Sequence, residues 1–250
     1  MAPVKKQAEP QTVMKGVVKK QVYPVTRTIL KAVPFKHSFT GVCAGPTGCG
    51  KTELMKGIIL NYKYMIRPAP HRVIWYFAER QLQLEKALRP IGVEFHQGMP
   101  ELEEFDGSQP VLLVVDDFMS ECNSAITKLF TKGSHHRNLS IWFLLQNFFH
   151  RGKEIRDITL NAHYLILFKN PRDCQQIKVL AQQMYDREYR FVLDAYKDAT
   201  KRPHGYLLLD VKQDTPDCAR VRSNILPGQK LWVYVPRKAY KSCKILTFTI

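Results

Sequence analysis

The stretch GPTGCGKT, from Gly45 to Thr52, matches the pattern G-x-x-x-x-G-K-[ST] at every fixed position. Its glycines allow successive backbone N–H groups to bind phosphate oxygens, and a helix that begins there adds the positive end of its dipole. The lysine reaches the β- and γ-phosphates, and the threonine hydroxyl binds Mg²⁺. The motif predicts a nucleotide site, with ATP and Mg²⁺ as cofactors, made by Gly45, Pro46, Thr47, Gly48, Cys49, Gly50, Lys51 and Thr52.

Two carboxylates follow a second apolar run, Val111 to Val115. Asp116 can hold a hydrated Mg²⁺, and Asp117 can polarise the attacking water. We therefore predict Thr52 and Asp116 as metal-binding residues, and Asp117 with Lys51 as catalytic residues. The simpler alternative is a turn that happens to be rich in aspartate, because Asp is common in turns.

Gln146 is a third polar residue at a strand end, thirty residues after Asp116. Its amide can bind the γ-phosphate or the lytic water, although a polar cap on the strand is an alternative. The 65 residues from Lys51 to Asp116 include a further strand and helix, over Val73 to Leu88. That strand can insert between the P-loop strand and the metal strand, an arrangement typical of motors and helicases.

Apolar runs and amphipathic stretches alternate along the chain, and several of the runs are apolar throughout, as in strands covered by helices on both faces. This pattern predicts an α/β P-loop NTPase of the RecA-like, additional-strand class, with a mostly parallel central sheet flanked by helices. Expected strands are Val22–Leu30, Phe39–Ala44, Val73–Phe77, Val93–Phe95, Val111–Val115, Ile141–Leu145, His163–Phe168, Tyr206–Leu209, Leu231–Val235 and Ile245–Ile250. Expected helices are Lys51–Tyr62, Arg80–Leu88, Ser120–Thr131, Cys174–Met184 and Tyr189–Ala199.

Positive charge is concentrated at the two ends of the chain. The 250 residues carry a net charge of +16, of which residues 1–40 and 219–250 hold +7 each. We therefore divide the chain into a flexible basic N-terminal arm (1–37), a P-loop ATPase domain (38–225) and a basic C-terminal extension (226–250). Basic ends suit a polyanionic partner, although they can also serve solubility or nuclear entry. Deleting residues 1–35 is expected to spare basal hydrolysis.

Several classes of protein are disfavoured by composition. The six cysteines form no C-x-x-C pair, so neither a disulfide framework nor a zinc site is expected. His135 and His136 have no Cys or acidic partner at ligand spacing, which disfavours a metal site there. No apolar run is long enough to span a bilayer, and no secretory signal is expected.

Four segments together resemble the genome-packaging ATPases of the FtsK–HerA superfamily, and most closely those of Maverick/Polinton elements and adintoviruses. They are Gly45–Thr52, Val111–Asp117, Ser134–Asn147 and Asn161–Asp173. The resemblance covers about residues 38–225. The P-loop motif occurs in many protein families, whereas the block from Ser134 to Asp173 is the part of the resemblance that is specific to these packaging ATPases.

The resemblance implies an ATP-driven motor that assembles as a homo-oligomeric ring, a hexamer, and pumps double-stranded DNA into a preformed capsid. It implies Lys51 and Thr52 on the phosphates and Mg²⁺, Asp116 on the metal, Asp117 as the catalytic carboxylate and Gln146 as the sensor. Many members have Glu where this chain has Asp117, which favours a water-bridged geometry here. The implied partners are duplex DNA and capsid protein, in the host nucleus or cytoplasm or with the virion.

A ring motor also needs an arginine supplied in trans, because positive charge at the γ-phosphate stabilises the transition state. Arg137 is the first candidate and Arg172 the second, although an arginine at a strand end is often a surface or ion-pair residue. Loops at residues 132–136 and 148–153 are candidates for contact with DNA phosphates.

Two other functions remain open. A nucleotide or polynucleotide kinase would use the same P-loop, but the sequence shows no obvious arginine-rich lid. A non-catalytic, ATP-dependent scaffold that binds DNA or capsid protein is the other alternative, which Asp117 and Gln146 disfavour.

Overall fold

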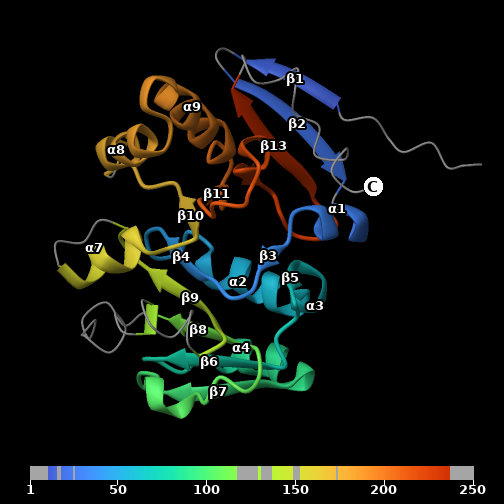
Figure 1. The fold of residues 1–250 in the computed structure, drawn as a ribbon, viewed down its shortest axis with the longest axis vertical. Coiled ribbons are helices and arrows are strands. Elements are labelled where there is room, and N and C mark those ends of the chain that lie inside the picture. Colours follow the sequence, from blue (N-terminus) through green and yellow to red (C-terminus); the bar gives the residue numbers. More distant parts are fainter. Residues whose placement is uncertain are drawn as a thin grey trace, which may run out of the picture.

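The computed structural model describes residues 11–15, 18–24, 26–116, 129–130, 137–148, 153–172 and 174–236. Within these ranges the chain builds one 11-stranded sheet with helices on both faces (Figure 1). The strand order is β1-β2-β13-β12-β11-β10-β4-β9-β8-β6-β7. A separate two-stranded sheet pairs β3 (Phe35–Lys36) with β5 (Ile66–Arg67).

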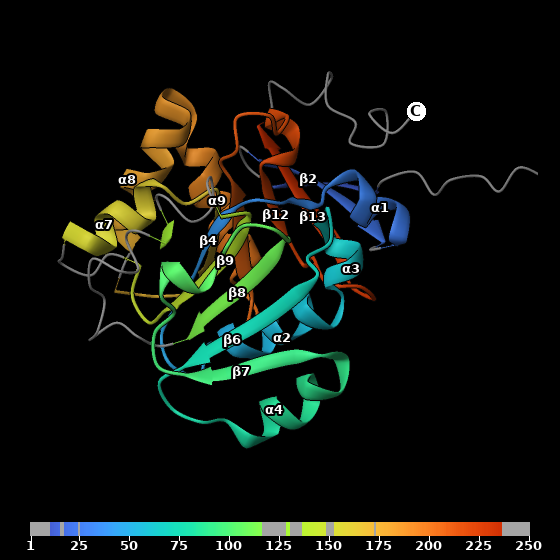
Figure 2. The same cartoon turned by 60° about the horizontal axis from the view of Figure 1, so that its bottom comes forward.

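Six neighbouring strands form the parallel part of the sheet, which Figure 2 shows from β4 to β7. All pairings from β10 through β4, β9, β8 and β6 to β7 are parallel. This arrangement confirms the predicted α/β fold with a parallel centre. The strands are β4 (Thr40–Ala44), β6 (Arg72–Phe77), β7 (Val93–Gln97), β8 (Val111–Asp116), β9 (Leu139–Leu145) and β10 (Tyr164–Phe168).

The strand between the P-loop strand and the metal strand is β9, not the expected strand over Val73–Phe77. β9 pairs with β4 on one side and β8 on the other, whereas β6 lies beyond β8. The additional strand therefore comes after the metal strand in sequence. Sequence spacing does not fix this order, because a parallel connection through a helix can return on either side of the preceding strand.

An antiparallel meander continues the sheet beyond β10. β11 (Tyr206–Asp210), β12 (Val221–Ser223) and β13 (Lys230–Pro236) follow in turn, and β13 then pairs with β2 (Val18–Pro24), which pairs with β1 (Gln11–Lys15). The predicted boundaries at residues 37 and 226 thus do not separate the domain from its ends. Residues 11–15, 18–24 and 230–236 are strands of the same sheet, because each supplies a hydrogen-bonding edge that its neighbour needs.

Helices cover both faces of the sheet and divide the core in two. Apolar residues of α2, α3 and α4 pack with Trp75, Trp142 and Tyr164 on one face, and those of α7, α8 and α9 pack with Phe143 and Leu165 on the other. The α-helices are α1 (Arg27–Ala32), α2 (Lys51–Leu60), α3 (Tyr62–Met65), α4 (Leu82–Leu88), α7 (Lys153–Leu160), α8 (Cys174–Tyr185) and α9 (Tyr189–Ala199). Short 3₁₀ turns lie at Arg89–Ile91, Leu102–Glu104, Asp186–Glu188 and Asp217–Ala219.

The expected strand over Val22–Leu30 is only partly present. β2 ends at Pro24, and helix α1 begins at Arg27 because the Thr26 hydroxyl accepts a hydrogen bond from the backbone N–H of Ile29 at 3.4 Å. Helix α7 was not expected. Most of the expected helix over Ser120–Thr131 and the expected strand over Ile245–Ile250 lie outside the described residues.

A buried ion pair ties the meander to the rest of the domain. Arg222 of β12 donates from Nη2 to Oδ2 of Asp210 at 2.7 Å, and the two side chains are only 2% and 3% exposed. Arg222 also donates from Nη1 to the carbonyl oxygen of Val33, just after α1. Asp210 accepts a further hydrogen bond from the Thr215 hydroxyl. This network joins β11, β12 and α1.

Candidate functional site

One cavity of about 640 Å³ lies at the carboxyl ends of the parallel strands. The P-loop follows β4, Asp116 ends β8, and Gln146 follows β9, so the parallel order brings the predicted residues to the same edge of the sheet. The cavity is lined by Thr47, Gly48, Gly50, Lys51, Thr52, Glu53, Leu54, Gln81, Asp116, Gln146, Phe168, His204, Tyr206, Leu226 and Gln229.

The P-loop has the backbone that phosphate binding requires. Gly48 and Gly50 adopt left-handed conformations, with φ of 77° and 108°, and Gly50 is the N-cap of α2. The Cys49 backbone N–H donates to the carbonyl oxygen of Pro46 at 3.2 Å, and that of Leu54 donates to Gly50 at 2.9 Å. The predicted strand–turn–helix context is therefore present.

Lys51 is the first residue of α2, and its ammonium group lies over the start of the loop. Nζ donates to the carbonyl oxygens of Gly45 at 2.6 Å and Pro46 at 3.2 Å. These contacts place the positive charge beside the backbone N–H groups of the loop. Together they match the chemistry that binds the phosphates of a nucleotide.

Asp116 presents a buried carboxylate to the cavity, with the residue only 6% exposed. Its Oδ2 accepts a hydrogen bond from Nε2 of Gln81 at 3.3 Å. Gln81 comes from the loop between β6 and α4 and was not predicted as a site residue. A carboxylate and a hydroxyl are hard oxygen ligands, so Asp116 and Thr52 fit the chemistry of Mg²⁺. They line the same cavity.

Gln146 is connected to the P-loop through the backbone of β9. The carbonyl oxygen of Leu145 accepts a hydrogen bond from the backbone N–H of Gly45 at 3.1 Å. This bond joins the end of the sensor strand to the first residue of the loop, and the Gln146 side chain lines the cavity. Gln146 is thus at the cavity, and its role as a sensor stays a prediction.

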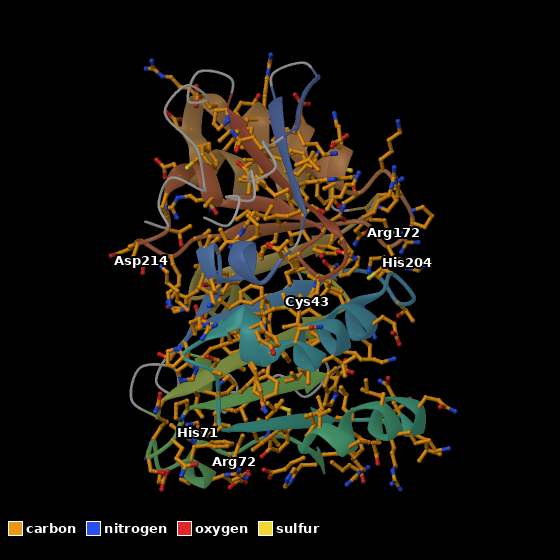
Figure 3. The ribbon with its side chains drawn as sticks, turned by 90° about the vertical axis from the view of Figure 1, so that its right-hand side faces the viewer. Cys43, His71, Arg72, Arg172, His204 and Asp214 are labelled. Carbon is orange, nitrogen blue, oxygen red and sulfur yellow. The ribbon has the colours of Figure 1, made fainter. Side chains whose placement is uncertain are left out.

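His204, which is labelled in Figure 3, contacts the backbone of Cys49 in the P-loop. The Nδ1 atom of His204 is 3.0 Å from the carbonyl oxygen of Cys49, and a carbonyl can only accept, so Nδ1 carries the proton. Burial raises the pKa of the Cys49 thiol more than the nearby Lys51 ammonium lowers it. Cys49 is therefore held as a neutral thiol rather than a reactive thiolate.

The cavity includes further residues that sequence reasoning missed. Phe168 ends β10, His204 precedes β11, and Tyr206 is the first residue of β11. Leu226 and Gln229 belong to the turn before β13. Of these residues, only Leu226 and Gln229 lie next to a sequence pattern that indicates their local structure, the turn-forming dipeptide Pro227-Gly228. Phe168, His204 and Tyr206 lie near the P-loop because strand pairing places β10 beside β4 and β11 beside β10.

The arginine candidates lie at opposite edges of the sheet. Arg137 precedes the amino end of β9, and the whole strand, roughly 23 Å long, separates it from Gln146. Its Nη1 donates to the carbonyl oxygen of Phe105 at 2.9 Å. Arg172 is exposed and follows β10, at the same sheet edge as the P-loop. Arg137 is therefore far from the cavity of its own chain, and its action on a neighbouring chain stays a prediction.

Several predicted residues lie outside the described part of the chain. They are Asp117, His135, His136 and most of the two loops proposed for DNA contact. Across the described residues, no three His, Cys, Asp or Glu side chains gather as a metal-binding group. The same residues include no helix that is both long and apolar enough to cross a membrane.

Comparison with solved structures finds parts of several ATPases that are similar to this chain. The cytoplasmic domain of the Thermomonospora curvata type VII secretion ATPase EccC gives a TM-score of 0.45 at 13% identity, over 79% of this chain and 25% of that chain. ATPases 2 and 3 of Thermomonospora curvata EccC, in complex with a signal sequence peptide, give a TM-score of 0.41 at 15% identity, over 80% of this chain and 37% of that chain. ATPases 2 and 3 of EssC from Geobacillus thermodenitrificans give a TM-score of 0.35 at 11% identity, over 66% of this chain and 40% of that chain.

This chain therefore spans less than half of the length of each of these structures. No protein-family model matches the sequence. No curated protein matches it either.

Proposed function

We propose that this chain hydrolyses ATP with Mg²⁺ at the P-loop cavity. One observation carries the proposal: Lys51, Asp116 and Gln146, from three segments far apart in sequence, line one cavity at the carboxyl ends of parallel strands. A strand lies between the P-loop strand and the metal strand, which leaves space beside the γ-phosphate for a polarised water.

Each residue has a distinct task in this proposal. Lys51 and the loop N–H groups bind the phosphates and offset the charge that develops on them during hydrolysis. Thr52 and Asp116 would hold the metal ion, which supplies charge neutralisation when bound. Gln81 orients the Asp116 carboxylate through its hydrogen bond. Asp117 would accept the proton of the attacking water, and Gln146 would position that water.

We further propose that hydrolysis drives double-stranded DNA into a preformed capsid, through a homo-oligomeric ring, a hexamer. The resemblance of Ser134–Asp173 to packaging ATPases supports this step, as does the net charge of +16. A translocating motor should contact DNA phosphates rather than bases, so binding should weaken steeply with salt. This work would take place in the host nucleus or cytoplasm, or with the virion.

The test is ATP hydrolysis by the full chain with and without double-stranded DNA. We expect DNA to stimulate hydrolysis, and Lys51→Ala and Asp117→Asn each to abolish it. Lys56→Ala, on the same helix and in an ion pair with the exposed Glu53, is the control and should keep wild-type activity. Phosphate transferred to a nucleotide acceptor would support a kinase instead. Nucleotide binding without turnover would support a scaffold.

The trans arginine is tested with mixed subunits. An inactive Asp117→Asn subunit can still donate an arginine to its neighbour, and an inactive arginine variant can still supply its own catalytic site. Mixing Asp117→Asn with Arg137→Ala should therefore restore part of the hydrolysis if Arg137 acts across an interface. The same mixture with Arg172→Ala tests the second candidate. A mixture that regains nothing removes that arginine from the assignment.

A further inference from the structure

The order of the strands decides which end of a nucleotide lies where in the cavity. Asp116 ends β8 and Gln146 follows β9, and both strands lie on one side of the P-loop strand β4. Phe168 and Tyr206 belong to β10 and β11, on the other side. The γ-phosphate must face the metal and the sensor, so the base must lie toward β10 and β11.

This second half of the cavity is predominantly apolar. Phe168 and Tyr206 are almost completely buried, and their ring centroids are 5.5 Å apart at 49°. The Tyr206 hydroxyl accepts a hydrogen bond from the backbone N–H of Ile225 at 2.9 Å, which holds the ring in place. Leu54 of α2 and Leu226 complete the apolar lining. Flat apolar surfaces of this kind suit an aromatic base.

The turn from Leu226 to Gln229 closes this half of the cavity. The Gln229 backbone N–H donates to the carbonyl oxygen of Leu226 at 3.1 Å, and Gly228 takes a φ of 83°, as a tight turn with Pro227 before it requires. Leu226 packs on Gly57 of α2, where an added Cβ would lie 2.6 Å from the leucine Cδ1. The turn is therefore seated directly on the helix that carries the P-loop.

Two polar side chains are held beside the apolar surface. The backbone N–H of Leu226 donates to Oε1 of Gln229 at 3.3 Å, which leaves the amide NH₂ of that residue as the group offered to a ligand. In the neutral ring of His204, whose Nδ1 donates to the carbonyl oxygen of Cys49, Nε2 is an acceptor. One donor and one acceptor next to flat apolar side chains match the edge of a nucleobase.

We propose that the turn Leu226–Gln229, with Phe168, His204 and Tyr206, is the nucleobase-binding wall of the P-loop cavity. This inference rests on the proposed function, because it names how the same site holds the rest of the nucleotide. The turn lies in the segment that sequence charge assigned to an extension outside the ATPase domain. The segment before β13 instead completes the nucleotide site.

The experiment compares two probes that share phosphates but differ in the base. Binding of Mg–ATP and of inorganic Mg–tripolyphosphate is measured by calorimetry on the full chain, for wild type, Leu226→Ala and Gln229→Ala. We expect each variant to bind ATP about tenfold more weakly, the effect of losing one apolar or hydrogen-bonding contact, and to bind tripolyphosphate within twofold of wild type. Lys51→Ala should lose the binding of both probes.

Two substitutions serve as matched controls. Leu60→Ala removes an exposed leucine from α2, and Gln213→Ala removes an exposed glutamine from the loop between β11 and β12. Neither residue lines the cavity, so both variants should bind ATP as the wild type does. Thermal unfolding checks each variant for folding. If Leu226→Ala does not fold, the test rests on Gln229→Ala, which changes an exposed residue.

The outcomes separate the two proposals. A wild-type chain that binds neither probe would overturn the proposed function and the base wall with it. A wild-type chain that binds both probes, with variants that weaken both equally or change neither, would overturn the base wall and leave the ATPase proposal standing. Loss confined to ATP supports the base wall.

Discussion

Gln81 donates a hydrogen bond from Nε2 to Oδ2 of Asp116 at 3.3 Å, so a loop after β6 contacts the carboxylate at the end of β8 that we propose as a metal ligand. The contact depends on β6 lying directly beside β8, where Phe77 pairs with Asp116 in the register. The loop is braced by Arg80, which forms an ion pair with the buried Glu85 of α4 at 2.8 Å. Gln81 is thus a positioning residue for the carboxylate.

Removing the Gln81 amide should make the site less able to hold Mg²⁺. Gln81→Ala is expected to raise the Mg²⁺ concentration for half-maximal ATP hydrolysis about three- to tenfold, because a hydrogen bond to a charged group contributes roughly 1 kcal/mol or more. The measurement is a Mg²⁺ titration of hydrolysis at saturating ATP. Gln83→Ala, an exposed glutamine on α4, is the control. An unchanged Mg²⁺ dependence would remove Gln81 from this role.

Two glycines of the P-loop should respond differently to a methyl group. A Cβ on Gly45 would lie 2.6 Å from Cβ of Phe168 and 2.7 Å from Sγ of Cys49, so Gly45→Ala forces the loop to move. A Cβ on Gly48 would meet nothing within 4 Å. Gly48→Ala is unfavourable only because alanine must adopt the left-handed φ of 77°, which destabilises the fold by about 1 kcal/mol. We expect Gly45→Ala to lose ATP binding and Gly48→Ala to lose some stability only. Calorimetric titration and thermal unfolding measure both effects.

The N-terminal segment should be needed for folding. β2 pairs with β13 along seven residue pairs, and Tyr23 and Ile29 are 2% and 4% exposed in the core. Burying each side chain contributes roughly 1.5–3 kcal/mol, so deletion of residues 1–35 removes a large share of a typical stability. We expect a lower midpoint of thermal unfolding and a loss of basal hydrolysis. A truncated chain with wild-type stability would restore the idea of an independent arm.

His37 should make stability depend on pH. Its Nε2 is 2.8 Å from Oδ1 of Asn138 and its Nδ1 contacts the Ser140 hydroxyl, while burial lowers its pKa below 6.5. The unfolded chain therefore binds a proton that the folded chain excludes, and the stability that His37 provides is lost as pH falls below 6.5.

We expect the free energy of unfolding to fall between pH 7 and pH 5 more steeply for the wild type than for His37→Gln, because glutamine does not titrate. Chemical unfolding at several pH values measures both slopes. Equal slopes for the two proteins would show that other groups cause the pH dependence.

The sequence by itself determined the features that are local. Gly45–Thr52 specifies a strand, a turn and a helix within one short stretch, because glycine conformations and helix capping act over a few residues. Apolar runs such as Val111–Val115 and Ile141–Leu145 identify strands covered on both faces. These patterns sufficed for the fold class and for Lys51, Thr52, Asp116 and Gln146 in the cavity.

Only the tertiary structure decided which strands are neighbours, and the rest of the site follows from that. β9 lies between β4 and β8, β6 brings Gln81 to Asp116, and β13 pairs with β2. The turn at Leu226 reaches the P-loop cavity although it lies far from Lys51 in sequence. Strand partners are selected by non-local packing and edge pairing, whose energy depends on residues distant in sequence, so a local pattern does not encode them.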